Sequence, residues 1–570
     1  MNHIKSPVHT PLMACPSILE FPSVLEFPLI LESPSILEFS SSLKSPSILK
    51  FPSSTICIIT CCLALFISCS PADQKEEIPD NQLPNIVYIL ADDMGYGDVS
   101  VLNPKSKIQT ANIDHLSETG IVFTDAHSTS AVCTPSRYSI LTGRYPWRSD
   151  LPKGVLWTRD SAFIRPERET VASLLQKQGY NTGVIGKWHL GWNWVFREDD
   201  PKQIDFSQAV GRSPNTVGFD YSYCILASLD IPPYVYVENN RPTAIPDSIV
   251  AGTSIAQYDF WRTGPLAPDL RFDDVLPNFT RRAVDFIDNQ TTEKPFFLYF
   301  PLTAPHTPIV PSEAFQGKSG INPYLDFCLE VDWSVGEIIN VLKRKNMYDN
   351  TIIVFASDNG SSSRSANYEV LLSNGHNSSA GFRGAKGDIF EGGHRVPFIF
   401  SFPKRLKNKK EFGSPVSLGD FMATVADITG FALPDNTAED SFSFYPLLTN
   451  GDADIIDRPV INASSDGSMA LREAAWKLEM CAGSGGWLSH PTNKEAAEIE
   501  GLPKYQLYNL DADPSERYNL IEVNDERVSN MVSRLRGYVK NGRTNAGTPQ
   551  ENNTRVPESM TWMTNEKFND

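Results

Sequence analysis

The segment from Cys133 to Arg144 brings together residue types that could do chemistry, in the order CTPSRYSILTGR. Pro135 suits the first turn of a helix, where its missing N–H costs nothing. The positive end of the helix dipole and the cation of Arg137 would then lie near Cys133. We expect an ordinary thiol in such a place to be acidic and reactive. The alternative is a buried, structural cysteine in front of a helix.

Four predicted strands elsewhere in the chain each end in residues that could bind a metal or transfer a proton. These strands and the residues that follow them are 85–91 with Asp92 and Asp93, 181–186 with Lys187 and His189, 296–300 with His306, and 351–356 with Asp358 and Asn359. A glycine-rich loop that contains Lys386 precedes a further apolar run at 398–400. Acids after one strand are often solvated loop residues or helix caps. The same pattern after four strands favours one shared site.

Helical and apolar segments alternate between these residues. Helical spacing at 167–178 and 330–345 separates continuous apolar runs, which are typical of strands buried on both faces. The pattern predicts an α/β fold with a large, mostly parallel sheet flanked by helices. The carboxyl ends of such strands meet at one edge of the sheet, where ligands bind.

The twelve-residue string and the motifs around it resemble the signature of type I sulfatases. The resemblance extends from about Pro84 to the carboxyl end and implies the alkaline phosphatase-like α/β fold of that family. In the family, the cysteine at the place of Cys133 is oxidised to 3-oxoalanine (formylglycine), and the hydrate of this aldehyde is the nucleophile. Motif by motif, the resemblance implies catalytic roles for Cys133, Arg137, Lys187, His189, His306 and Lys386, and metal binding by Asp92, Asp93, Cys133, Asp358 and Asn359.

The implied metal ligands are three carboxylates and one amide oxygen, a set that suits a hard cation. Conversion of the cysteine would remove the one thiolate that favours zinc. Calcium accepts six to eight oxygen ligands at flexible geometry, whereas magnesium prefers to keep water. We therefore expect Ca²⁺.

The expected reaction is the hydrolysis of a sulfate monoester. One hydroxyl of the hydrated residue 133, activated by the metal and by a carboxylate such as Asp358, would attack sulfur. Lys386 or His306 would protonate the departing alcohol, and His189 would take the proton of the second hydroxyl so that sulfate is released. Fixed cations would neutralise the sulfate group: Lys187, Lys386, His306 and the metal.

The other histidines and a group of tryptophans have structural interpretations as well as functional ones. We expect His115 and His127 to pack or to lie on the surface. His376 and His394 flank Lys386, and His394 could either contact substrate or be structural. A set of three tryptophans is interpreted either as an aromatic wall for a sugar ring or as core: Trp188, Trp192 and Trp194.

Length and charge limit the kind of protein this can be. The chain has 570 residues and 41% hydrophobic residues, enough for one large domain and a smaller one. The formal net charge of −18 argues against nucleic acid as a partner, because phosphate binding needs a basic face.

The first 83 residues are not expected to belong to a folded domain. Residues 1–53 form a low-complexity extension of hexapeptide repeats such as PSILEF, in which proline blocks both helix and central strand. Residues 54–69 are typical of a signal or lipoprotein segment, with Cys69 as a candidate lipid anchor, and 70–83 form a linker. The segment predicts export to the periplasm or the cell surface.

The remaining chain divides into a catalytic domain at 84–450 and a smaller α+β subdomain at 451–570. Short antiparallel strands are expected in the subdomain at 460–463, 468–472 and 476–480. The segment 220–247 is predicted to be an insertion that lines the cleft.

Export and the family resemblance favour a sulfated carbohydrate or polysaccharide as substrate. They also imply a formylglycine-generating enzyme, or an anaerobic sulfatase-maturating enzyme, as a partner. Two alternatives remain open at this point. One is a phosphatase or phosphonate monoester hydrolase of the same superfamily, and the other is a non-catalytic lipoprotein that binds sulfated glycans.

Overall fold

The computed structural model describes residues 82–253, 258, 260–449, 458–553, 560, 562 and 563. The chain divides into two units, Met1–Glu77 and Ile78–Asp570, and all structural statements below concern the second unit. The predicted repeat extension, the signal or lipoprotein segment and Cys69 lie outside the described residues. Within the described ranges, none of the helices combines the length and the apolar character needed to cross a membrane.

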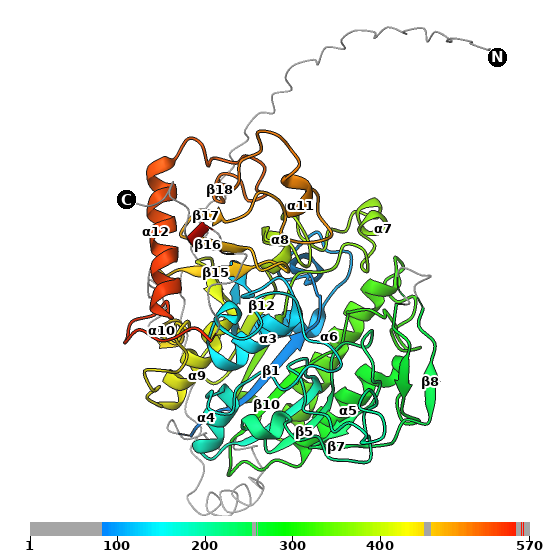
Figure 1. Cartoon of the computed structure of the whole chain (residues 1–570). Coiled ribbons are helices and arrows are strands. Elements are labelled where there is room, and N and C mark those ends of the chain that lie inside the picture. Colours follow the sequence, from blue (N-terminus) through cyan, green and yellow to red (C-terminus); the bar gives the residue numbers. More distant parts are fainter. Residues whose placement is uncertain are drawn as a thin grey trace, which may run out of the picture. The chain divides into compact units, whose positions relative to one another are not determined.

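A ten-stranded sheet forms the centre of the unit, in the order β13-β2-β12-β11-β1-β10-β4-β5-β6-β7 (Figure 1). Its five central strands are parallel: β11 (Thr351–Ser357), β1 (Asn85–Ala91), β10 (Phe296–Pro301), β4 (Asn181–Lys187) and β5 (Tyr221–Ile225). The remaining strands extend the two edges: β13 (Lys410–Phe412), β2 (Gly120–Phe123), β12 (Phe398–Ser401), β6 (Val237–Glu238) and β7 (Arg241–Pro242). The prediction of a large, mostly parallel sheet is confirmed.

Both faces of this sheet are buried, as the continuous apolar runs predict. In β1, Tyr88 and Leu90 join the core on one face, whereas Val87 and Ile89 join the core on the other. The first face is covered by α3 (Cys133–Thr142), α4 (Val171–Lys177) and α9 (Phe421–Thr429). The second face is covered by α2 (Ala111–Glu118), α5 (Val275–Asp288) and α6 (Pro323–Arg344).

The helix α6 begins seven residues before the helix predicted from spacing. The side chain of Asn322 accepts a hydrogen bond from the N–H of Leu325, and Pro323 occupies the first turn. Both are signals of a helix start, because a capping side chain and a residue without N–H satisfy the first unpaired amides. The helix predicted at 167–178 is, by contrast, shorter in the structure, because Thr170 caps it.

One prediction needs correction, and one apolar run takes a direction that the sequence left open. The strand at 398–400 exists as β12, but it runs antiparallel to β11 and β2. The segment 220–247 is not simply an insertion, since its first part is β5, which pairs in parallel with β4. Residues 226–236 follow the carboxyl end of β5, and the chain then returns to the sheet as β6 and β7, which pair antiparallel.

The small antiparallel sheet near the carboxyl end is confirmed. It consists of β15 (Val460–Ala463), β16 (Met469–Glu473), β17 (Trp476–Glu479) and β18 (Gln506–Asn509), with α12 (Asp525–Asn541) packed on one face (Figure 1). Backbone hydrogen bonds join β15 to the segment before Cys133. The N–H of Ala463 donates to Thr129 O at 3.0 Å, and the N–H of Ala131 donates to Ala463 O at 2.8 Å. The small sheet therefore supports the backbone that leads into α3.

The other short elements connect these layers. They are β3 (Ala126–His127) paired with β14 (Val416–Ser417), β8 (Ser248–Val250) paired with β9 (Gly264–Leu266), α7 (Tyr368–Ser373), α8 (Glu391–His394), α10 (Pro446–Thr449) and α11 (Asn493–Ala496).

Candidate active site

The ends of the parallel strands bring the predicted site residues to one edge of the sheet. Ala91 at the end of β1 is level with Ser357 at the end of β11, so Asp92 and Asp358 begin their loops side by side. The N–H of Asp358 donates to Ala91 O at 3.1 Å. At the end of β4, Gly186 has a φ of 133°, and a Cβ there would lie 1.9 Å from Pro301 O of β10. Only glycine permits this close approach, which sets the position of Lys187.

Cys133 is the first residue of α3, and its side chain lies among these charges. Its Sγ is 3.5 Å from Asp92 Oδ1 and 3.7 Å from Lys386 Nζ, and the residue is only 2% exposed. The expectation of an acidic thiol is wrong. Burial raises the pKa of Cys133 well above its ordinary value, and the carboxylates of Asp358 and Asp92 add to this against the opposing effect of Lys187 and Lys386.

Three buried cations alternate with three buried carboxylates around residue 133. Lys187 Nζ donates to both oxygens of Asp92, at 2.7 and 2.9 Å. Lys386 Nζ donates to Asp93 Oδ2 at 2.7 Å.

Arg137 completes this set of charges. It donates through Nε to Asp358 Oδ2 at 2.9 Å and through Nη1 to the carbonyl oxygen of Lys187, also at 2.9 Å. The three acids and three bases nearly balance, so a divalent cation would leave the site with the surplus of positive charge that an anionic substrate needs.

The pKa values of these groups follow from burial and from their partners. Burial raises the pKa of Asp92. The charges of Lys187, His306 and Arg137 lower it by a larger amount, so the net pKa lies below the ordinary value. For Asp358 the effect of burial prevails over that of Arg137, and its pKa is raised. For Lys386 burial lowers the pKa, but Asp93, Cys133 and Asp92 together outweigh burial, so the net pKa is raised. Lys386 therefore stays charged.

His189 is a neutral imidazole with one free nitrogen. Its Nε2 lies 3.1 Å from Leu156 O, which places the proton on that nitrogen. Its Nδ1 is buried and has no hydrogen-bond partner among the described residues. Burial, followed by the charges of Lys187 and Arg137, lowers the pKa of His189 well below its ordinary value. The backbone of His189 has a φ of 54°, a strained conformation of the kind found at functional sites.

His306 lies at the outer side of the site, as Lys386 does. Its Nδ1 donates to the carbonyl oxygen of Thr307 at 2.7 Å, and its Nε2 faces Asp93 Oδ2 at 3.6 Å. Its side chain is 9% exposed, as is appropriate for a group that could meet a leaving group at the mouth of the site.

The donor atoms at this edge fit a hard cation. Ligand atoms of Asp92, Asp93, Cys133 and His306 lie within 4.8 Å of one another. Asn359 Nδ2 donates to Asp93 Oδ1 at 2.7 Å, which leaves Asn359 Oδ1 buried and, within the described ranges, without a hydrogen-bond partner. An unpaired buried acceptor beside carboxylates is what a bound cation would satisfy.

Four other histidines within the described ranges do not join the site: His115, His127, His376 and His394. His115 bonds to Glu118 on the surface, and His376 is buried against Asp98. His127 and His394 share a bond of 3.0 Å between their Nδ1 atoms, and both are fully buried. The functional interpretation of His394, contact with substrate, is wrong, because both ring nitrogens are engaged within the protein, Nδ1 with His127 and Nε2 with the carbonyl oxygen of Ile389 at 2.8 Å.

His394 belongs to a buried network that includes Lys477 of the four-stranded sheet. Its Nε2 lies 3.1 Å from Lys477 Nζ of β17. The same ammonium group pairs with the carboxylates of Glu516 at 2.6 Å and of Glu391 and Glu479 at 3.2 Å each. One cation from the small sheet thus holds three buried acids, one of which, Glu391, begins α8 in the loop after Lys386.

The exposed tryptophans beside the site are not the three that the sequence suggested. The tryptophans Trp188, Trp192 and Trp194 are buried in the core, so they do not form an exposed wall. Two other tryptophans, which sequence reasoning missed, are half exposed beside site residues. Trp487 lies against the backbone of Gly387, next to Lys386, and Trp157 follows the residue that bonds to His189. No periodicity or motif marks either of them.

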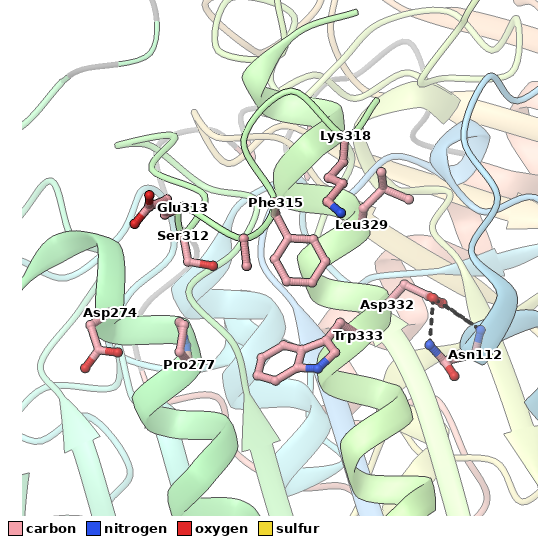
Figure 2. A pocket seen from close by; sticks show the side chains of 11 residues that line it. Asn112, Asp274, Pro277, Ser312, Glu313, Phe315, Lys318, Leu329, Asp332 and Trp333 are labelled. Carbon is pink, nitrogen blue, oxygen red and sulfur yellow. Dashed lines mark hydrogen bonds between the residues drawn. The ribbon is translucent and has the colours of Figure 1, made fainter. Parts of the chain in front are cut away.

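A large hollow of about 1020 Å³ lies elsewhere, between α5 and α6 (Figure 2). Phe315 and Trp333 form one wall, and Asp332 bonds to Asn112 at the edge (Figure 2). Asp332 also accepts the N–H groups of Asn112 and Ile113, so this carboxylate caps α2. None of the proposed catalytic or metal-binding residues lines the hollow.

Comparisons with known proteins agree with this arrangement. A family model described as Sulfatase matches residues 84–431. The N-acetylgalactosamine-6-O-sulfatase of Bacteroides thetaiotaomicron is 32% identical over 516 residues, which cover 83% of this chain and 96% of that protein. The steryl-sulfatase of Homo sapiens is 32% identical over 416 residues, covering 64% of this chain and 69% of that protein.

Solved structures show the same fold. A Bacteroides thetaiotaomicron structure described in connection with glycosaminoglycan metabolism has a TM-score of 0.71 and 30% identity, covering 80% of this chain and 99% of that one. A structure in complex with a neocarrahexaose has a TM-score of 0.61 and 27% identity, covering 82% and 95%. The phosphonate monoester hydrolase of Agrobacterium radiobacter, at 17% identity and a TM-score of 0.51 over 79% and 94%, shares the fold alone.

Proposed function

Because the chain belongs to the sulfatase family of sulfuric ester hydrolases, we propose that it removes sulfate from a sulfated carbohydrate through an oxidised residue 133 and a calcium ion. The observation that carries the proposal is the position of residue 133. It lies at a helix N-terminus, within 4 Å of both an anionic metal-ligand candidate, Asp92, and a charged lysine, Lys386.

The proposed metal ligands are Asp92, Asp93, Asp358 and Asn359, together with residue 133. Their oxygen donors and the unpaired Asn359 Oδ1 suit calcium. When present, calcium would neutralise charge on the sulfate group, and oxidised residue 133 would supply a hydrated aldehyde as nucleophile.

The protein's own side chains have separate roles in the proposal. Lys187 and Lys386 bind and orient the sulfate group at fixed positions, which stabilises charge that develops on its oxygens. Arg137 fixes Asp358 and the end of β4, and so acts as a positioning residue. This arrangement excludes water from all but the outer side of the site, since these residues are buried.

Proton transfer is assigned to the two histidines. His189 is neutral, and its free Nδ1 can accept a proton from residue 133 when sulfate leaves. His306, at the exposed side, can donate a proton to the departing alcohol, with Lys386 as the other candidate donor.

The first substrate to test is a 6-O-sulfated N-acetylhexosamine. This choice rests on the name of the Bacteroides relative and on its nearly complete coverage by this chain. A structural relative bound to a neocarrahexaose supports sulfated carbohydrate more generally.

The proposal is tested on protein co-expressed with a formylglycine-generating enzyme. The peptide that contains residue 133 should have the mass of the aldehyde, and the protein should release sulfate from N-acetylgalactosamine 6-sulfate. A Cys133→Ala variant, prepared in parallel, should release none. Faster release of phosphate from an aryl phosphate or a phosphonate monoester would overturn the proposal in favour of the other hydrolases with this fold.

Export is also part of the proposal. The segment 54–69, with Cys69 as the candidate lipidation site, supports a periplasmic or cell-surface location and a maturation enzyme that acts before or during export. Cell fractionation and the amino-terminal sequence of the processed protein would test it, and an unprocessed protein in the cytoplasmic fraction would contradict it.

A further inference from the structure

Three side chains that the proposed reaction does not use lie together beside the site. They are Trp157, Asp230 and Arg262. Arg262 Nη1 is 2.6 Å from Asp230 Oδ2, and the Arg262 guanidinium carbon lies 4.8 Å from the centre of the Trp157 ring system. Trp157 is 48% exposed and the side chain of Arg262 is 38% exposed, so both can meet a ligand.

Backbone contacts fix Trp157 next to the reacting group. The N–H of Leu156 donates to Thr134 Oγ1 at 3.2 Å, and Leu156 O accepts from His189 Nε2 at 3.1 Å. Thr134 directly follows Cys133 in α3. Leu156 is therefore hydrogen-bonded both to the helix that begins with Cys133 and to His189, and Trp157 is the next residue in the chain.

Asp230 reaches the site from the neighbouring strand. The N–H of His189 donates to Leu226 O at 2.8 Å, immediately beyond β5, and Asp230 follows four residues later. Burial opposes ionisation of Asp230, but His306 and then Ser228 and Arg262 outweigh it and lower its pKa. The carboxylate is therefore ionised and lies within electrostatic reach of His306, at the mouth of the site.

The pair is held rigidly and its charge is balanced. Arg262 also donates to the carbonyl oxygen of Asp230, through its backbone N–H at 3.2 Å and through Nη1 at 3.0 Å. Since the carboxylate compensates the guanidinium, the pair attracts a second anionic substituent only weakly. The pair instead offers the N–H donors of Arg262 beside the acceptor oxygens of Asp230. Two neighbouring hydroxyls of a sugar can bond to such a combination, because a hydroxyl both donates and accepts.

Trp157 supplies the third element of a sugar site. A flat, half-exposed indole offers an apolar face on which the C–H face of a pyranose ring can pack. Arg262 lies over the same ring system, so the position of the indole is linked to that of the charged pair.

We propose that Trp157, Asp230 and Arg262 form the subsite for the sulfated sugar ring and select an uncharged pyranose with free hydroxyls over a uronic acid. The inference rests on the proposed sulfatase function and names the substrate class within it. Asp230 and Arg262 determine specificity, and Trp157 binds the ring.

The test compares a sugar sulfate with a substrate that has no sugar. Trp157→Ala and Arg262→Met should each raise KM for N-acetylgalactosamine 6-sulfate about tenfold. For 4-methylumbelliferyl sulfate, which has no ring hydroxyls that could bond to the charged pair, Arg262→Met should lower kcat/KM much less than it does for the sugar sulfate. Trp157→Phe, which keeps a flat ring, should recover part of the affinity for the sugar sulfate. Equal losses of Arg262→Met on the two substrates would overturn the subsite.

A second variant tests selection by charge. Asp230→Asn leaves Arg262 without its compensating carboxylate, so the ratio of kcat/KM for a sulfated uronic acid to that for N-acetylgalactosamine 6-sulfate should rise about tenfold. An unchanged ratio would contradict the proposal. If the wild-type protein released sulfate from neither the sugar nor the aryl sulfate, the proposed function itself would fail, which is a different result.

A second Arg–Asp pair, at the carboxyl ends of α5 and α6, provides a matched control for Arg262 and Asp230. Arg344 pairs with Asp288 at 2.7 Å, where α6 and α5 end, and both side chains are exposed. Arg344→Met and Asp288→Asn remove equivalent charges there and should change neither the selectivity ratio nor KM.

Discussion

Glu330 of α6 is a buried acid whose ionisation should destabilise the folded protein. The residue is fully buried, its Oε2 accepts the N–H of Ser312 at 2.9 Å, and its Oε1 has no hydrogen-bond partner among the described residues. Burial raises the pKa of Glu330 to about 7, and Asp273 and Asp274 add to the shift. Ser312 belongs to the segment between β10 and α6 that also carries His306, so Glu330 tethers that segment.

The sign of the pH dependence follows from this shift. Between pH 4.5 and 7 the folded protein keeps the proton on Glu330 whereas the unfolded chain releases it, so the folded state loses stability as pH rises. Above pH 7 both states are ionised and the loss is complete. Between pH 5 and pH 8 the loss is about 2.5 kcal/mol.

Glu330→Gln removes this titration while it keeps an oxygen that can accept from Ser312. The free energy of unfolding of the variant, relative to the wild type, should therefore increase by about 2.5 kcal/mol from pH 5 to pH 8. Urea unfolding, followed by tryptophan fluorescence at constant ionic strength, measures this difference. Glu337→Gln, on the same helix at a partly exposed position, controls for the loss of one carboxylate. Parallel pH profiles for Glu330→Gln and the wild type would refute the argument from burial.

Further predictions concern the nucleophile, the metal and the buried network. Cys133→Ser should take up one sulfate group per molecule and then stop, as intact mass would show, because a single hydroxyl cannot drive its own release; repeated turnover would contradict this. Dialysis against a calcium chelator should abolish sulfate release, and added calcium should restore it better than magnesium. Lys477→Met leaves Glu391, Glu479 and Glu516 without their shared cation and should cost about 3–5 kcal/mol of stability, measured by urea unfolding. An unchanged urea midpoint would show that the network does not need the charge.

The central sheet could be predicted because its signal is local. Continuous apolar runs at 85–91, 296–300 and 351–356 correspond to β1, β10 and β11, and parallel strands bring their following residues to one edge. The direction of β12 could not be predicted, since a run of three apolar residues at 398–400 carries no information about which neighbour it will pair with. The start of α6 was misplaced because the capping signals at Asn322 and Pro323 precede the clearest apolar spacing.

The site was only partly accessible from sequence. Motif residues could be named, and the structure places them together, but their environments depend on contacts far apart in the chain. Cys133 was expected to be acidic because its local surroundings are cationic, whereas burial and the carboxylates from β1 and β11 determine its pKa. Trp157 and Arg262 are more than 100 residues apart, so no local pattern could reveal that they meet.

The contact between β15 and the backbone before Cys133 has a consequence for the timing of maturation. The bonds from Ala463 to Thr129 and Ala131 cannot form until roughly 330 further residues have been synthesised after Cys133, which takes about 20–60 s at typical rates of translation. Once they form, the thiol is only 2% exposed and out of reach of a modifying enzyme. Late synthesis of the strand that closes this region thus keeps the cysteine open to oxidation while the chain is still being made.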